Sequence, residues 1–412
     1  MKKIMLCTIL LSTILYAGEL FVDYNTGKTG NTGSKTSPFP SLSYAIKKVV
    51  PGDTIYILPS NKPILDNVYL NNIKGTAQKP ITIDGMNNIF TGARPLNSAQ
   101  WKMVKPHLYK KKVIAGANIY GRFFMIIDGK ANFMGRVKKS RGNHSKAYKK
   151  VEELAPGEWT LVVGKKVSDK GVHHQFEVEY FVRLPEGSNS LSDKRVAEPL
   201  VTQLDGVCLR GNSQHLVIRN MIMKNFYNDG YNLHGKCHNI AFENIAAVDC
   251  GDDGISAHET CTLTLKNGVF IGCSTAICHI NHAVATHENI YAEKIIGSEF
   301  LFLNDQLNDL KNAYFITDSL GGSFWNLPKD TCKGKLENIY SISNNPKATF
   351  LIVGKHKENL NLKDIQLANF KQISKDKEIK KVASKDIEKK IKETKKALFS
   401  LFNGNLEKAL SN

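Results

Sequence analysis

Three segments near the middle of the chain share one pattern: DGVCLRGNS at Asp205–Ser213, DGYNLHGKC at Asp229–Cys237 and DGISAHETC at Asp253–Cys261. The Asp-Gly pairs recur every 24 residues, and the residues that follow them alternate between apolar and polar. Alternation with a period of two predicts a short strand that is buried on one face. A unit of this length cannot bury its apolar face alone, so the repeat predicts stacked coils that bury it together.

A second repeated feature lies between these segments. Each unit contains a short apolar run followed by an asparagine: Leu216–Ile218 by Asn220, Ile240–Phe242 by Asn244 and Leu263–Leu265 by Asn267. Asparagine accepts the left-handed backbone conformation at a turn and can bond to the equivalent asparagine about 4.8 Å away in the next coil. The leucine-rich repeat signature and helical periodicity are both absent. We therefore predict an all-β fold, a right-handed parallel β-helix.

The first 17 residues have the pattern of a signal peptide. Lys2 and Lys3 precede an apolar run, Ile4–Ile14, and Leu15–Ala17 offers a cleavage site. The run is too short to span a bilayer core of about 30 Å, and no later segment approaches about 18 consecutive apolar residues. We expect an exported protein, periplasmic or extracellular, with no membrane span. A lipid anchor at Cys7 is the alternative.

The remaining chain divides into one long domain with two additions. Residues 18–370 are predicted to form the β-helix, with an amphipathic helix at Leu42–Ile46 that covers the first coil. Residues 101–200 break the period and are predicted to be an inserted, β-rich excursion. Residues 371–412 are rich in lysine and carry an amphipathic pattern, which predicts a helix that caps or packs on the C-terminal end. An unstructured tail is the alternative.

The chain is strongly basic, with a formal net charge of +18, or +16 without the two lysines of the signal peptide. In an exported protein this charge favours an anionic partner such as an acidic polysaccharide. A lysine-rich organism would give the same composition, which is the alternative. No nucleic-acid-binding motif is present. We expect a monomeric protein with a polysaccharide partner and no nucleic-acid partner.

Seven cysteines follow the signal peptide, an odd number that excludes a complete set of disulfides within the chain. Cys237 and Cys261 are 24 residues apart, and Cys250 and Cys273 are 23 apart. Equivalent positions of adjacent coils lie about 4.8 Å apart, within the range of Cα separations that a disulfide allows. Both pairs could therefore form disulfides in an oxidising compartment, or stack as free thiols in the core.

The N-terminal part of the chain resembles a known family. The stretch YNTGKTGNTGSKTSPFPSLSYAIKKVVPGDTIYILPS at Tyr24–Ser60 and the stretch KPITIDG at Lys79–Gly85 are similar to the opening coils of secreted parallel β-helix carbohydrate enzymes, notably polysaccharide lyases. These motifs are typical of the architecture more than of one chemistry. The resemblance implies a protein that acts on a polysaccharide.

Polar side chains gather on one outer face where the coils repeat best. Alternation within the strands turns Asn232, His234 and His258 outward. Arg210 holds the position of His234 one coil earlier, so these three basic side chains form an external column, which Glu259 follows. We predict that Arg210, Asn232, His234 and Glu259 bind the substrate. The alternative for each histidine is an ordinary polar residue on the surface.

Carboxylates lie at the bend that leads into this face. Asp229, Asp252 and Asp253 precede the strands, and alignment of the two cysteines 23 residues apart places His279 beside Ser256 on the outer face. Clustered carboxylates raise the pKa of one member, which keeps a carboxylic acid available for proton transfer. Asp-Gly is also ordinary turn chemistry, and that role suffices for the first Asp-Gly pair, because its strand has Arg210 in the position where the next two coils have a histidine.

Two of these segments resemble a second family. YNDGYN at Tyr227–Asn232 and CGDDGIS at Cys250–Ser256 are similar to the two carboxylate motifs of polygalacturonase-type glycoside hydrolases, in which a histidine follows one coil later. His279 occupies that place, but it is not flanked by glycines and no Arg-x-Lys pair follows it. The resemblance covers about 60 residues of the chain, over which it implies an inverting hydrolase.

The same resemblance implies the role of each residue. Asp253 or Asp252 would be the general acid, Asp229 with the remaining aspartate would activate water, and His279 would tune the acid. His258 is added from the external column. The predicted catalytic residues are Asp229, Asp252, Asp253, His258 and His279.

A polysaccharide lyase is the close alternative. Arg210, His234 or His258 would then abstract a proton, and Asp229, Asp252, Asp253 and Glu259 could hold Ca²⁺. The hydrolase requires no cofactor. A metal such as zinc at the histidines and Asp253 is a further alternative. A protein that binds a glycan without catalysing a reaction is the last alternative.

Overall fold

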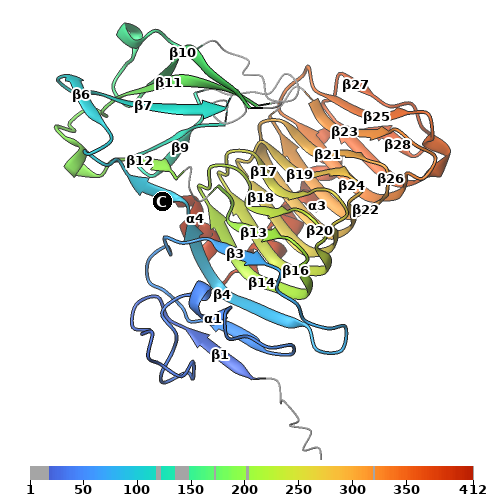
Figure 1. The fold of residues 1–412 in the computed structure, drawn as a ribbon. Coiled ribbons are helices and arrows are strands. Elements are labelled where there is room, and N and C mark those ends of the chain that lie inside the picture. Colours follow the sequence, from blue (N-terminus) through green and yellow to red (C-terminus); the bar gives the residue numbers. More distant parts are fainter. Residues whose placement is uncertain are drawn as a thin grey trace, which may run out of the picture.

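The structure is a computed structural model that describes residues 18–116, 122–134, 148–170, 173–200, 204–318 and 321–411. The predicted signal peptide, with Cys7, lies outside these residues. Most described strands belong to two long parallel sheets, in which each strand pairs with its equivalent from the next coil (Figure 1). The predicted parallel β-helix is therefore confirmed.

Most coils supply one strand to each sheet. In order, the 11 described strands of the long sheet are β1 (Glu19–Val22), β2 (Thr54–Ile57), β4 (Ile81–Thr91), β14 (Gln214–Lys224), β16 (His238–Val248), β18 (Thr262–Ile271), β20 (Val284–Ile295), β22 (Leu307–Thr317), β24 (Lys333–Ser343), β26 (Leu360–Ala368) and β28 (Ile379–Lys381). The nine described strands of the short sheet are β3 (Val68–Asn71), β13 (Val207–Arg210), β15 (Tyr231–Leu233), β17 (Asp253–Ala257), β19 (Thr275–Asn281), β21 (Ser298–Asn304), β23 (Gly321–Leu327), β25 (Thr349–Gly354) and β27 (Gln372–Ile373).

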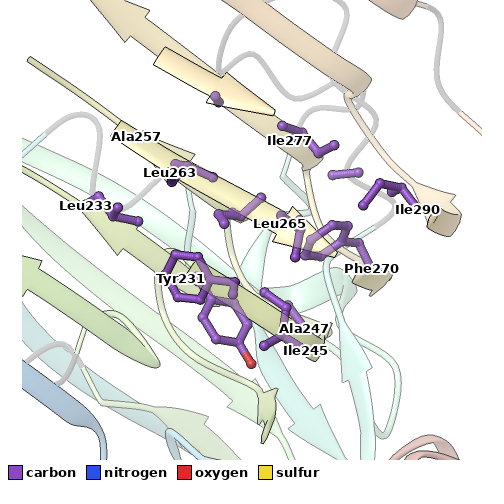
Figure 2. Close-up of a cluster of buried hydrophobic side chains, with 14 of the residues drawn as sticks. Tyr231, Leu233, Ile245, Ala247, Ala257, Leu263, Leu265, Phe270, Ile277 and Ile290 are labelled. Carbon is purple, nitrogen blue, oxygen red and sulfur yellow. The ribbon is translucent and has the colours of Figure 1, made fainter. Parts of the chain in front are cut away.

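The register follows the repeat in the sequence. Tyr231 pairs with Ile255 and Leu233 with Ala257, an offset of 24 residues. All four side chains are fully buried in the main core. Tyr231, Leu233 and Ala257 point into the coil, toward apolar side chains of the long strands (Figure 2). Burial between stacked coils is what a 24-residue unit needs, because one coil has no second layer of its own.

A ladder of asparagines bends the long strands. Asn220, Asn244 and Asn267 have φ of 55°, 53° and 61°, the left-handed region that asparagine tolerates. The amide nitrogen of Asn244 donates to Oδ1 of Asn220 at 3.0 Å, and that of Asn267 donates to Oδ1 of Asn244 at 2.8 Å. The ladder continues through Asn289, Asn312 and Asn338. The predicted role of these asparagines is confirmed.

The seven described cysteines are all buried free thiols. Cys237 and Cys261 have fully buried side chains in the same core as Cys250 and Cys273. Of the two arrangements that the sequence left open, the structure has the free-thiol ladder.

The N-terminus begins with β1 and a short helix, α1 (Leu42–Ala45). Ser41 caps this helix by accepting a hydrogen bond from the backbone nitrogen of Tyr44. Leu42 and Ala45 are buried in the main core, so the helix covers the first coils as predicted.

The C-terminal segment forms α3 (Ser384–Ser400) and α4 (Asn405–Ser411). These helices do not cap the end of the stack, so that part of the prediction is wrong. α3 contacts β18 to β26, and α4 contacts β4, β14 and β16, so both lie lengthwise on the outer face of the long sheet. Their apolar residues meet outward apolar side chains of that sheet, which is why they lie along it. No helix of the described residues is long and apolar enough to cross a membrane.

The excursion lies beside the coil stack (Figure 1). It contains two antiparallel sheets of four described strands each: β10 (Trp159–Lys170), β11 (His173–Arg183), β7 (Leu108–Gly116) and β6 (Lys102–Lys105); and β5 (Ala93–Pro95), β12 (Val196–Pro199), β8 (Met125–Ile127) and β9 (Lys130–Asn132). Short 3-10 turns occur at Val151–Glu153 and Leu191–Asp193, and another, outside the excursion, at Lys357–Asn359.

The excursion has its own core, centred on Trp101, Trp159 and Tyr180. Pairing of Ala93 with Pro199 closes its base, so it begins slightly earlier than the predicted Trp101. β4 pairs directly with β14, and the coils therefore continue as though the excursion were absent. Tyr227 of the coils packs into the excursion core and fixes the excursion to the stack.

Candidate functional site

Aspartates line the corner that leads into the short sheet. Asp205, Asp229 and Asp253 occupy equivalent positions of three coils, and all three are buried. Oδ1 of Asp229 accepts a hydrogen bond from the backbone nitrogen of Asp253 at 2.9 Å. Asp205 accepts hydrogen bonds from the amide nitrogens of Asn228 and Asn232. The column is therefore tied into the backbone of the coils.

Asp252 adds a third carboxylate beside Asp229 and Asp253. One oxygen from each of these residues lies within 4.8 Å of the others, and all three side chains are buried. Asp229 and Asp253 meet because they occupy equivalent positions of adjacent coils, and Asp252 meets them because it precedes Asp253 in the chain. The arrangement can hold a proton or a cation between carboxylates.

The excursion reaches this cluster through Arg122. Nη2 of Arg122 lies 2.6 Å from Oδ2 of Asp252, and Nη1 donates to Oδ1 of Asn228. The main chain of Arg122 lies against Gly251, where a Cβ would touch its carbonyl oxygen and clash with that of Tyr227. Glycine is required there because the backbones approach so closely.

The charges of the cluster act on one another. Burial raises the pKa of Asp229 well above its ordinary value, and the carboxylates of Asp253, Asp205 and Asp252 raise it further, while Arg122 opposes them. Burial would lower the pKa of Arg122, but the same acidic neighbours outweigh it and raise that pKa. The cluster therefore retains a proton to a higher pH than an exposed aspartate does.

The predicted external column is present. The rings of His234 and His258 stack with centroids 4.0 Å apart, and Nδ1 of His234 lies 3.2 Å from the Glu259 carboxylate. Nε2 of His258 is 2.9 Å from Oγ of Ser256. Burial, aided by the neighbouring His234, lowers the pKa of His258 to about 4, so this imidazole is neutral at pH 7 and can accept a proton. Burial also lowers the pKa of His234.

The other two predicted binding residues both interact with Asp205. Arg210 is partly exposed, with Nη2 3.8 Å from Asp205. Asn232 faces outward from its coil but is only 3% exposed, and its amide nitrogen is bound to Asp205. Its Oδ1 has no hydrogen-bond partner within the part of the chain that the structure describes. Asn232 can therefore accept a hydrogen bond only from a group that enters the corner.

The predicted position of His279 is wrong. Ser256 pairs with Cys278, and His279 pairs with the inward residue Ala257. His279 is fully buried, with Nε2 2.9 Å from Nε2 of His287. Burial, with His287, lowers its pKa well below the ordinary value. A neutral histidine inside the coil cannot tune an acid on the outer surface, so the role that the resemblance implied does not apply.

The error comes from the register. The cysteines at 250 and 273 are 23 residues apart, but Asp253 and Thr275, which pair, are only 22 apart. The coil therefore loses one residue between its cysteine and its strand, and a slip of one residue turns every side chain to the opposite face. The coil that begins at Cys250 therefore has one residue more before its strand than the next coil has, and the pair Asp252–Asp253 includes this residue.

Arg122 was missed because it lies outside the repeat. No periodic pattern surrounds it, and nothing in the residues near 122 indicates which coil it would meet. The unusual sequence next to Gly251 was the available signal, since a glycine before two aspartates allows another backbone to approach. It does not identify the approaching segment.

Comparisons with known proteins support the fold. No family model matches the chain, and no curated protein matches it. A solved structure of XylC in complex with xylose is 10% identical, covers 86% of this chain and 69% of its own, and has a TM-score of 0.50. A glycoside hydrolase (10% identity, TM-score 0.44, 89% and 96% covered) and pectate lyase Pel9A (11% identity, TM-score 0.43, 89% and 77% covered) are also similar. The chain thus shares its fold with the XylC structure.

Proposed function

We propose that the protein is an exported, monomeric enzyme that hydrolyses an anionic polysaccharide at the cluster of Asp229, Asp252 and Asp253. The observation that carries the proposal is the meeting of three buried carboxylates, one with a raised pKa, beneath an arginine of the excursion. Glycoside hydrolysis needs one protonated carboxyl group and one ionised carboxylate near the scissile bond. No cofactor is required for this chemistry.

The roles follow from the charges. Asp229 has the raised pKa and is the proton-holding member, the reverse of the assignment implied by the sequence resemblance. Asp252 or Asp253 then activates water as an ionised carboxylate. An acid group of the substrate competes with Asp252 for Arg122, which frees the carboxylate and binds the substrate in one exchange. Arg210 and the external column supply further contacts to the glycan.

A calcium-assisted lyase is the second candidate, because the same three carboxylates can offer three oxygen ligands. Bound Ca²⁺ would neutralise the acid group of a uronate and so acidify the neighbouring C–H bond. His258 would take that proton, because its imidazole is neutral at pH 7 and partly exposed, but its lowered pKa makes it a weak base. The guanidinium of Arg122 already occupies part of the cluster, which favours the hydrolase.

A panel of anionic polysaccharides distinguishes the candidates. The hydrolase predicts new reducing ends without the absorbance of an unsaturated uronate, and activity that survives a chelator. The lyase predicts that absorbance and loss of activity with the chelator. Binding without either product would contradict both and leave a glycan-binding protein.

A further inference from the structure

A hollow lies along the same corner as the carboxylates, further along the stack. Asp253 pairs with Thr275, and Thr275 pairs with Ser298, so Ile296 is the equivalent of Gly251 two coils further on. The backbone nitrogen of Ile296 donates to the carbonyl of Cys273 in the coil between them. Two coils correspond to about 10 Å along the stack.

The excursion covers both places. Arg122 lies against Gly251, whereas Ile127 and the strand β9 lie near Ile296. At the second of these places, beside Ile296, is a hollow of about 500 Å³, lined by Ile127, Lys130, Asn132 and Phe133 of the excursion and by Ile296 of the coils. One segment of the excursion therefore forms a wall over the carboxylates and then over the hollow.

The lining suits a sugar. Phe133 is partly exposed and its ring is held by Phe124, with centroids 4.7 Å apart. Lys130 is exposed at the edge of the hollow. An aromatic ring can pack on the apolar face of a pyranose, and an ammonium group pairs with a carboxylate or sulfate. Mostly apolar walls with a few polar groups are typical of ligand sites.

We propose that this hollow is a subsite for an acidic sugar residue of the same polysaccharide, about two coils from the reacting bond. The inference rests on the proposed function and extends it, because an enzyme with this subsite binds several consecutive sugar residues of the polysaccharide. Continuity with the carboxylate corner and the positive charge of Lys130 favour this occupant over an unrelated ligand.

The test compares substrates of graded length. Kinetics are measured on oligogalacturonates, alginate oligosaccharides and sulfated glycosaminoglycan oligosaccharides, for the wild type and for Lys130→Ala and Phe133→Ala. Lys165→Ala, an exposed lysine on the other sheet of the excursion, is the matched control. We expect KM for long substrates to rise about tenfold in both variants, roughly 1.4 kcal/mol, with the shortest cleaved substrate and the control unchanged. Lys130→Ala keeps the test valid if Phe133→Ala disturbs packing.

The outcomes separate the two proposals. Equal effects on all lengths, or none, would overturn the subsite while the hydrolase stands. Glycan binding without cleavage, weakened by Lys130→Ala only for long chains, would retain the subsite and overturn the hydrolase. A wild type that neither binds nor cleaves any probe would overturn both.

Discussion

On the outer side of the long sheet the side chains beneath the C-terminal helices are apolar, whereas at the corner beneath the excursion they are acidic. Ile222, Val248 and Val269 meet Ile391, Phe402 and other side chains of the helical segment. At the corner, the carboxylate of Asp252 forms an ion pair with the guanidinium of Arg122. Both covers come from parts of the chain outside the repeat, but they differ in chemistry.

The two contacts therefore differ in kind. The C-terminal helices cover the apolar face permanently, whereas a ligand can replace Arg122 or its partner at the acidic corner. Removing the helices would expose a continuous apolar strip, at a cost that grows with its area. The side chain of Arg122 is 37% exposed, so water already competes for its ion pair, and an anionic ligand can replace its partner. We therefore expect the first face to determine stability and the second to determine function.

The largest stability effect should come from the helical cover. Phe402 is fully buried against the long sheet, whereas its neighbour Leu401 is 36% exposed. Phe402→Ala should lower the free energy of unfolding by about 3–5 kcal/mol, and Leu401→Ala by about 0.5 kcal/mol or less. Urea unfolding measures both. Similar values for the two variants would mean that α3 and α4 are not a fixed part of the fold.

The acidic corner should show the opposite behaviour. Asp253→Asn removes a negative charge from a buried cluster, so we expect unchanged or slightly higher thermal stability and turnover reduced by about 10² to 10⁴. Asp309→Asn, an aspartate on the outer face of the long sheet, is the control with normal turnover. Full activity of Asp253→Asn would remove the cluster from the mechanism.

Sequence reasoning succeeded where the coils repeat and failed where the period changes. The pairing of Tyr231 with Ile255 and the asparagine ladder follow from local alternation and a fixed offset. His279 was misplaced because one residue is lost within a coil, and hydrophobicity alone does not show the slip: the cysteines of both coils remain buried. Arg122 could not be found, because contact between an insertion and a coil leaves no periodic signal.

A carboxyl group inside the coil, that of Glu299, can be compared with those of the acidic corner, because no substrate can reach it. Glu299 is fully buried between the hydroxyls of Ser323 and Ser341. Burial raises its pKa from 4.5 to about 7, although the two hydroxyls oppose the shift. The folded state therefore prefers the protonated form, and stability falls as the pH rises from about 4.5 through 7, by roughly 3 kcal/mol.

Replacement by glutamine should remove this dependence. Glu299→Gln should flatten the decline in unfolding free energy between pH 5 and pH 8, as followed by urea unfolding at each pH. Its effect on turnover should be small, in contrast to that of Asp253→Asn. A wild-type stability that does not change over this range would mean that Glu299 is ionised in the fold.

Loss of the Arg122 side chain from the acidic corner should have a smaller effect on stability and turnover. Arg122 lowers the pKa of Asp229, so Arg122→Ala should raise it and move the basic limb of the pH–rate profile of kcat to higher pH. Unfolding free energy should change by about 1 kcal/mol or less. Arg195→Ala, in an exposed ion pair with Asp128, controls for general charge loss. An unshifted profile would mean that Arg122 and the proton-holding carboxyl are not coupled.

The smallest effect should come from a third outer face, which carries charged side chains on the long sheet. One residue per coil forms a column of alternating charge on the long sheet: Asp84, Arg219, Glu243, Lys266, Glu288, Lys311, Glu337 and Lys363. Opposite charges on neighbouring strands support the in-register stack, but exposed pairs contribute little.

Glu288 tests how little, because its carboxylate lies 3.8 Å from Lys311 and both side chains are nearly half exposed. Glu288→Gln should change the unfolding free energy by about 0.5 kcal/mol or less, whereas Glu288→Lys places three lysines in succession and should cost more at low salt than at high salt. Urea unfolding at two ionic strengths measures this. A large, salt-independent loss in Glu288→Gln would show that this open face holds the coils together as firmly as the helix-covered face does.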